Sequence, residues 1–344
     1  MTHEEYEDFR NKVALLGATI DTVYLEDGST CDFIQYSPDT TILYIPENVK
    51  YMFSSSKYSY QYENRIRKVS GNLIVVGGGP NLQSTSEMFK DCMIESIDLT
   101  GFDTSAVTMM NSMFESQFIK KIKFGKMSTS SAKVMREMFK RCIISELDLS
   151  NFDTSNVECM YSMFYDCFIE KLNLSSFNTE KVDNMSKMFT GVHIKELDLS
   201  SFDTRNVEDM SYMFQDSKIG TLNVSSFDVC KVRNIKGMFS KCITSTLNLS
   251  SFKTCKASNF NNMFNGCETD VINLHNFSPS FVYYAQNMFR NTKAKVIDIS
   301  MFELSRSSVI NNMFLHCDAK FISNSHAVRE KINFYQNNDK YIVQ

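Results

Sequence analysis

Ten Met-Phe pairs divide most of this sequence into units of equal length. The first pair is Met88-Phe89, the last is Met313-Phe314, and each pair begins 25 residues after the one before it. A fixed period of about 20–50 residues is typical of solenoids, in which each repeat packs only against its neighbours. The spacing therefore predicts one continuous stack of rungs, where a chain of 344 residues could otherwise form separate globular domains.

Each unit combines the period of a strand with the period of a helix. In unit 145–169, Leu147 and Leu149 alternate with polar residues, which indicates a strand with one buried face. An Asp-Thr-Ser cluster suited to capping a helix follows. After it come apolar residues at spacings of three and four, here Val157, Met160, Met163 and Phe164. We expect an α/β repeat solenoid, right-handed and leucine-rich-repeat-like, with one parallel sheet and short helices on the other side.

The repeats divide the chain into three parts. Residues 1–69 do not follow the pattern, and we expect an N-terminal cap made of a helix and a hairpin that turns at Asp27-Gly28. Residues 70–319 hold ten repeats, of which the first is degenerate, and residues 320–344 form a C-terminal cap. One face of the N-terminal helix is expected to be buried, with Tyr6, Phe9, Val13 and Leu16.

Composition argues against several classes of partner. A net charge of −4 provides no global basic field, so nucleic acid is not expected as a partner. No apolar run approaches the roughly 18 residues of a membrane-spanning helix. The ten cysteines form no CxxC pair and the first residues show no apolar signal region, so we expect reduced thiols in a cytoplasm.

The repeat also resembles a known family. The pattern LDLSNFDTSNV-x-x-M-x-x-MF-x-x-C, read from residues 147–167, closely resembles the BspA-like surface proteins of bacteria and protists. The resemblance covers roughly residues 70–335 and implies a leucine-rich-repeat-like solenoid that binds proteins or adheres to surfaces without catalysis. Members of this family also occur in phages and other mobile elements. The export signal common in the family is missing from this sequence.

Polar columns on the outer strand face are the first candidate site. One column lies between the strand leucines and the other lies just before the first of them. Neighbouring carboxylates are avoided in both, as an in-register parallel ladder requires. As candidate partner-binding residues we list Asp98, Asp148, Asn173 and Asp198 in the first column, and Glu146, Lys171 and Glu196 in the second.

The second full unit, 120–144, is unusually basic. Its lysines at positions that are polar or acidic in most other units are Lys120, Lys121, Lys123 and Lys126. They either neutralise carboxylates of the neighbouring rungs (Asp98, Glu146 and Asp148) or form a basic stripe for a partner with an acidic surface. The sequence leaves both interpretations open.

Other chemistry-bearing residues are better explained by structure. Six cysteines share the column that follows the predicted helix: Cys92, Cys142, Cys167, Cys242, Cys267 and Cys317. They could bind a metal or form disulfides, but small buried residues at a tight turn explain them better, because no His column accompanies them. His316-Cys317 lacks a reproducible nucleophile–base arrangement. Gly77–Pro80 lacks the Gly-Lys-Ser/Thr ending of a phosphate loop and indicates a corner.

We therefore expect a non-enzymatic protein-binding solenoid without a cofactor or catalytic residues, acting inside a cell. One version is an inhibitor of a host protein, encoded by a mobile element. The alternative is a surface or virion adhesin of the BspA-like type. The identity of the partner and the oligomeric state stay open.

Overall fold

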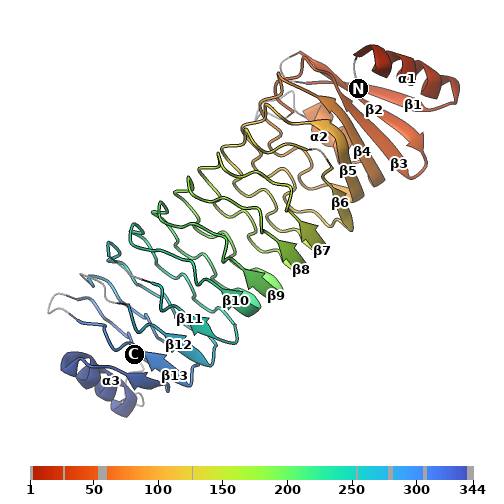
Figure 1. Cartoon of the computed structure of the whole chain (residues 1–344). Coiled ribbons are helices and arrows are strands. Elements are labelled where there is room, and N and C mark those ends of the chain that lie inside the picture. Colours follow the sequence, from red (N-terminus) through yellow and green to blue (C-terminus); the bar gives the residue numbers. More distant parts are fainter. Residues whose placement is uncertain are drawn as a thin grey trace.

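The computed structural model describes residues 3–25, 28–52, 60–125, 127–252, 255–277, 282–304 and 308–338. The chain forms an elongated parallel-sheet β-solenoid of about ten turns (Figure 1). Helices lie at the two ends of the stack, and the repeats form the continuous middle part. Each repeat packs against its neighbours, as in other solenoids.

The N-terminal cap supplies the first strands of the sheet that continues into the repeats. Its elements are α1 (His3–Leu15), β1 (Thr19–Tyr24), β2 (Thr30–Ser37), β3 (Thr40–Ile45) and α2 (Tyr60–Ile66). The predicted hairpin is present, because β1 and β2 pair antiparallel. In α1, Tyr6 and Val13 are buried, but Leu16 lies beyond the end of the helix and is 82% exposed, so its predicted place in the core was wrong.

From β3 onward all strand pairs are parallel, and each rung adds its strand to one side of the stack (Figure 1). Residues 25 apart pair directly, as Ile144 does with Ile169 and Leu147 with Leu172, which confirms the predicted in-register ladder. The repeat strands are β4 (Ser70–Gly78), β5 (Met93–Asp103), β6 (Lys121–Lys123), β7 (Ile143–Asp148), β8 (Phe168–Asn173), β9 (His193–Asp198), β10 (Lys218–Asn223), β11 (Leu247–Asn248), β12 (Val271–Asn273), β13 (Val296–Asp298) and β14 (Lys320–Ile322).

The side of the rung opposite the strands is not helical, and this corrects the expected α/β class. In the described part of the chain, helices occur only at the two ends, in α1, α2 and α3 (His326–Asn338). The segments that carry the Met-Phe pairs form consecutive turns. Ser162 and Asp166 lie in the left-handed region at φ 53° and 54°, which a right-handed helix cannot accommodate.

Hydrogen bonds explain why turns replace the helix. The amides of Met160, Ser162 and Phe164 donate to carbonyls of the next rung 24 residues later, at 2.9–3.1 Å. The intervening amides of Met163 and Tyr165 donate within the rung to the third residue back. A helix would use all these donors internally, whereas alternating turns tie each rung to its neighbour on this side as well.

The phenylalanines of the Met-Phe pairs form one ladder through the core. Consecutive rings from Phe89 to Phe314 stack at centroid distances of 5.3–5.8 Å. All ten side chains are 0% exposed. The predicted buried seam is therefore confirmed, although the backbone that holds it is not helical.

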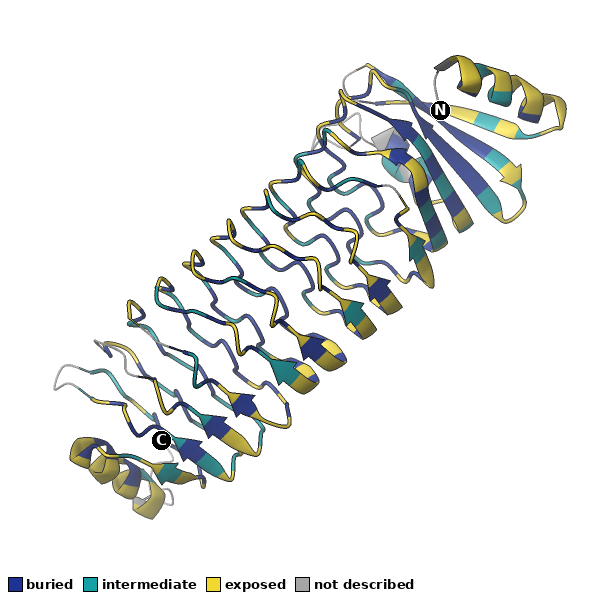
Figure 2. Ribbon diagram, in the orientation of Figure 1, coloured by how far each residue is buried: buried dark blue, intermediate teal, exposed yellow. Residues whose placement is uncertain are grey.

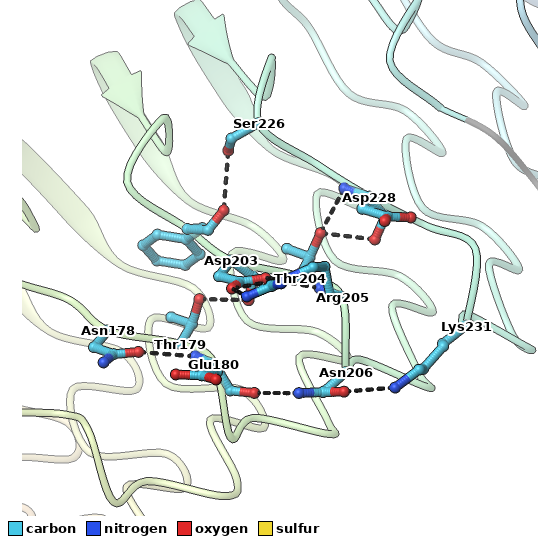
Figure 3. A network of polar contacts seen from close by, with 11 residues as sticks. Asn178, Thr179, Glu180, Asp203, Thr204, Arg205, Asn206, Ser226, Asp228 and Lys231 are labelled. Atoms are coloured by element: carbon cyan, nitrogen blue, oxygen red, sulfur yellow. Dashed lines mark hydrogen bonds and ion pairs between the residues drawn. The ribbon is translucent and has the colours of Figure 1, made fainter.

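A second, polar ladder stabilises the corners of five consecutive rungs, and Figure 3 shows part of it. Its members are Thr104, Thr129, Thr154, Thr179 and Thr204, and Val229 takes this position in the next rung. Buried Thr204 donates from Oγ1 to the carbonyl of Asp228 at 2.8 Å, and the same hydroxyl accepts the amide of Asp228 at 2.8 Å. Thr154 makes the same two bonds to Asn178. The Asp-Thr-Ser cluster thus bridges consecutive rungs, where the sequence suggested a helix cap.

The cysteine column consists of buried free thiols. Cys142 and Cys167 each donate from Sγ to a phenylalanine carbonyl of the preceding rung at 2.8 Å. Burial raises the pKa of Cys142 to about 12, so this thiol stays protonated at neutral pH. In a different column, Cys230 and Cys255 of consecutive rungs form a disulfide, so the expectation of reduced thiols is wrong for this pair.

The described helices include none that is both long and apolar enough to cross a bilayer.

Candidate functional site

The outer face of the parallel sheet carries exposed side chains whose identity differs between rungs. In β7, Ile144 and Leu147 point into the core, while Ile143, Ser145 and Glu146 are exposed. The same alternation recurs in β8 and β9, so each rung presents several side chains to solvent on this face (Figure 2). We call this surface the strand face.

The Asp/Asn column of the strand face has a structural role. The side chains of Asp148, Asn173 and Asp198 each accept the backbone amide two residues further on, at 3.0–3.1 Å, which ends the strand. Asn173 also donates to Asp148 of the preceding rung at 2.9 Å. These predicted partner-binding residues are therefore already bonded within the protein, as Asp98 is to the amide of Thr100.

The second predicted column is in register but does not form ion pairs. Glu146 lies opposite Lys171 in the backbone register of neighbouring strands, and Lys121 and Glu196 occupy the same position in other rungs. Among the described residues, none of these four side chains has an ion-pair partner within 4.0 Å. The alternation of sign avoids repulsion between rungs while leaving the charged ends in solvent.

Two of the four predicted lysines of the basic second unit pair with carboxylates of the rung before it. Lys120 lies 2.8 Å from Glu95, and Lys123 lies 2.9 Å from Asp98. Burial raises the pKa of Asp98, but the hydrogen bonds from Thr100 and the contact with Lys123 outweigh it and lower that pKa below its ordinary value. These distances favour the neutralising interpretation for both lysines. Lys126 lies outside the described residues.

The sequence interpretation missed an exposed apolar column on this face. Met93, Phe118, Ile143 and Phe168 occupy the same position of four consecutive rungs and are 78%, 63%, 48% and 51% exposed. Bridges between Phe118 and Ile143 and between Ile143 and Phe168 confirm their register. Their exposure could have been predicted from the sequence. Each of the four directly precedes an isoleucine that faces the core, so the alternation of the strand turns it toward solvent. We call these four residues the apolar column.

The apolar column leads into a groove of about 860 Å³ across strands β8, β9 and β10. Exposed Phe168 and Ile243 stand at its two ends, whereas Ile169, Ile194 and Ile219 in its lining have side chains that are buried in the core, as that of Ile144 is. A large, mostly apolar hollow of this kind is the usual form of a binding site. We call it the lysine groove, because Lys171, Lys195 and Lys218 are among the residues that line it.

Three lysines line this groove: Lys171, Lys195 and Lys218. In the part of the chain that the structure describes, none of them has a carboxylate within 4.0 Å or a side-chain hydrogen bond. Glu170 is the one carboxylate among the lining residues. Lysines at the equivalent positions of a later rung, Lys293 and Lys295, are in contrast paired with Glu268 at 2.6 Å and Asp270 at 2.8 Å.

Gly220 keeps the lysine groove open. It occupies the position of Lys195 in the next rung, and its lack of a side chain widens the hollow. A Cβ at this residue would collide with the carbonyl oxygen of Lys195. Glycine therefore both fits the close approach of the two rungs and shapes the surface.

The other sequence candidates remain without a site. The described residues contain no group of three or more His, Cys, Asp or Glu side chains that could hold a metal ion. Of the predicted corner Gly77–Pro80, Gly77 and Gly78 still belong to strand β4, where a Cβ at either would collide with a backbone carbonyl. The turn begins at Gly79, whose carbonyl accepts the amide of Leu82 at 3.1 Å.

Three overlapping regions of the chain match a protein family described as "Mycoplasma protein of unknown function, DUF285". The matched regions are residues 83–195, 168–277 and 221–327, which together span more than half of the 344-residue chain. Comparison with curated proteins gives no match, and neither does comparison with solved structures. The matches cover most of the repeats and the whole lysine groove, so the chain belongs to the DUF285 family.

Proposed function

We propose that this protein is a non-enzymatic binding solenoid whose strand face contacts another protein. The observation that carries the proposal is the apolar column, four large side chains exposed in succession beside an apolar groove. Contiguous apolar surface of this kind marks interaction sites in soluble proteins. The extended faces of repeat solenoids serve the same purpose in other proteins.

The rest of the rung supports this choice of face. The turn side and the corners are held by hydrogen bonds between rungs, and the phenylalanine ladder lies in the core. On the strand face, exposed side chains such as Phe168, His193 and Lys218 differ from one rung to the next, as selection of one partner requires.

We propose a partner inside a cell, because eight of the ten cysteines are free thiols. An inhibitor encoded by a mobile element is one form of this proposal. The second candidate is an adhesin of the BspA-like type, displayed on a cell or virion. The Cys230–Cys255 disulfide favours it, since disulfides persist mainly in oxidising compartments. Fractionation of the native source decides between the two locations.

Affinity capture with matched variants tests the function itself. One variant carries Phe118→Ser and Phe168→Ser in the apolar column, and the control carries Glu158→Lys and Asp183→Lys on the exposed turn side. We expect a protein that the unmodified chain and the control retain and that the strand-face variant loses. Equal capture by all three chains, or loss only from the control, would contradict the proposal.

A further inference from the structure

We propose that the lysine groove binds an extended acidic segment of a partner protein, with one bulky apolar residue of that segment packed against Phe168. This inference rests on the proposed protein-binding function and names the chemistry of the partner. It is carried by charge complementarity, because three lysines surround an apolar hollow and have no carboxylate within 4.0 Å among the described residues, in a chain whose net charge is −4.

The dimensions of the groove fit a short extended segment. Phe168 and Ile243 are three rungs apart, which corresponds to about 14 Å at the usual spacing of parallel strands. An extended chain covers about 3.3–3.6 Å per residue, so roughly four residues cross the groove. The register of β8, β9 and β10 aligns the groove with the stack, so the segment would run along the solenoid axis.

The exposed apolar side chains determine where the apolar residue binds. Ile169, Ile194 and Ile219 are already buried in the core, so the apolar surface open to a partner lies on Phe168 and Ile243, which are half exposed in the free protein. His193 and Lys218 lie between these two in the same column, so one aromatic or leucine side chain packs against Phe168 alone. Burial of that surface supplies affinity that charge alone does not.

The lysines determine the charge of the segment. Lys195 and Lys218 come from consecutive rungs, so carboxylates spaced one or two residues apart can reach both. Among the residues that the structure describes, their ammonium groups have no ion-pair partner to give up, whereas Lys293 and Lys295 would first have to leave Glu268 and Asp270. An acidic segment therefore gains more at the lysine groove than at the equivalent positions of the later rung.

A peptide rather than a nucleic acid fits these features best. Nucleic-acid affinity comes mainly from many phosphate contacts, and a single cluster of three lysines opposed by Glu170 provides few. A phosphate backbone would also leave the exposed apolar surface of Phe168 and Ile243 uncovered.

Fluorescence anisotropy with the full chain tests the proposal. The probe is a labelled peptide of about 12 residues, long enough to overhang the groove. It carries one phenylalanine followed by alternating glutamates in a Gly/Ser background. Two matched peptides replace the glutamates by glutamine or the phenylalanine by alanine. We expect saturable binding of the first peptide, weakened by salt, and at least about tenfold weaker binding of each control.

Paired variants locate the site. Lys195→Gln with Lys218→Gln should weaken binding at least about tenfold. Ser245→Trp should do the same by filling the groove, because Ser245 is an exposed lining residue. The matched control, Lys293→Gln with Lys295→Gln, removes two lysines from the same two columns and should leave binding unchanged. Circular dichroism of all variants verifies that they are folded.

Several outcomes would overturn the inference. These are no binding of the acidic peptide, equal loss in the Lys293/Lys295 control, or displacement by an oligothymidylate of equal charge. A concentration-dependent dimer that the Lys195/Lys218 variant abolishes would make a second copy of the chain the occupant. If the captured protein depends on the apolar column but not on these lysines, the proposed function stands and this inference fails. If the peptide binds but no captured protein depends on the strand face, the proposed function fails instead.

Discussion

Replacement of one ring in the phenylalanine ladder tests the energetics of the stack. Phe189 is 0% exposed and stacks on Phe164 at 5.4 Å and on Phe214 at 5.8 Å. A buried Phe→Ala change usually costs about 3–5 kcal/mol. Each stacked pair adds about 0.5–1.5 kcal/mol beyond the buried area, and this change removes two pairs. We therefore expect Phe189→Ala to lower the free energy of unfolding by about 4–5 kcal/mol, near the top of that range.

The matched control is Phe168→Ala, which removes a side chain of the same type from the strand face. Phe168 is half exposed, so its loss should cost under about 1 kcal/mol. Urea unfolding followed by circular dichroism measures both values from the midpoint and slope. A cost below about 1 kcal/mol for Phe189→Ala, or equal costs for the two variants, would refute the reasoning that the ladder carries stability and the strand face does not.

Four further results are expected. Thr204→Val should cost about 1–3 kcal/mol in urea unfolding, because it leaves two backbone groups of the next rung unpaired, while exposed Thr221→Val should cost little. Arg205 holds the pKa of Asp203 below its ordinary value, so the stability this carboxylate contributes is present above the unfolded pKa of about 3.9 and is lost as pH falls through the lower folded value. Asp203→Asn should therefore flatten the decline of the melting temperature on acidification. Thiol titration of the unfolded, non-reduced protein should find eight free thiols. Far-UV circular dichroism should show about a tenth helix, since α1, α2 and α3 contain 13, 7 and 13 residues.

Each of these results has a clear opposite. Equal costs at Thr204 and Thr221 would remove the corner ladder as a source of stability. An unchanged acid profile in Asp203→Asn would mean that this carboxylate does not couple to folding. Ten free thiols would contradict the disulfide, and a helix content near a third would mean that the rungs contain helices.

The features that repeat were predictable from the sequence. Strand alternation at Leu147 and Leu149, the in-register columns and the buried Met-Phe seam all follow from which side chains must avoid water. These predictions depend on side-chain pattern alone, which the sequence records directly.

The conformation of the turn side was not predictable in the same way. Apolar residues at spacings of three and four fit a helix, but they fit equally well a series of turns that close every third residue. Ser162 and Asp166 adopt positive φ without being glycine, so this unit alone does not indicate the turn. The equivalent positions of other rungs do carry such a signal, because Gly191, Gly237 and Gly266 also have positive φ there. Hydrogen bonds to the next rung favour the turns over a helix, and the sequence of a single unit does not show these bonds.

The candidate site was predictable only in part. The strand face followed from the alternation, but the residues chosen within it were those with the most regular charges, and Asp148 and Asp198 proved to be bonded internally. The lysine groove depends on which lysines lack a partner and on the space left by Gly220. Both are properties of the assembled stack.

Site-specific photo-crosslinking tests the central claim most directly. A photoreactive residue placed at position 168 lies on the strand face beside the groove, and one placed at position 158 lies on the exposed turn side of a neighbouring rung. Illumination of each purified chain in an extract of the native source, followed by mass spectrometry, identifies what each position contacts. We expect one protein crosslinked through position 168 and none through position 158. Crosslinking through position 158 alone would place the binding surface on the opposite side and contradict the account.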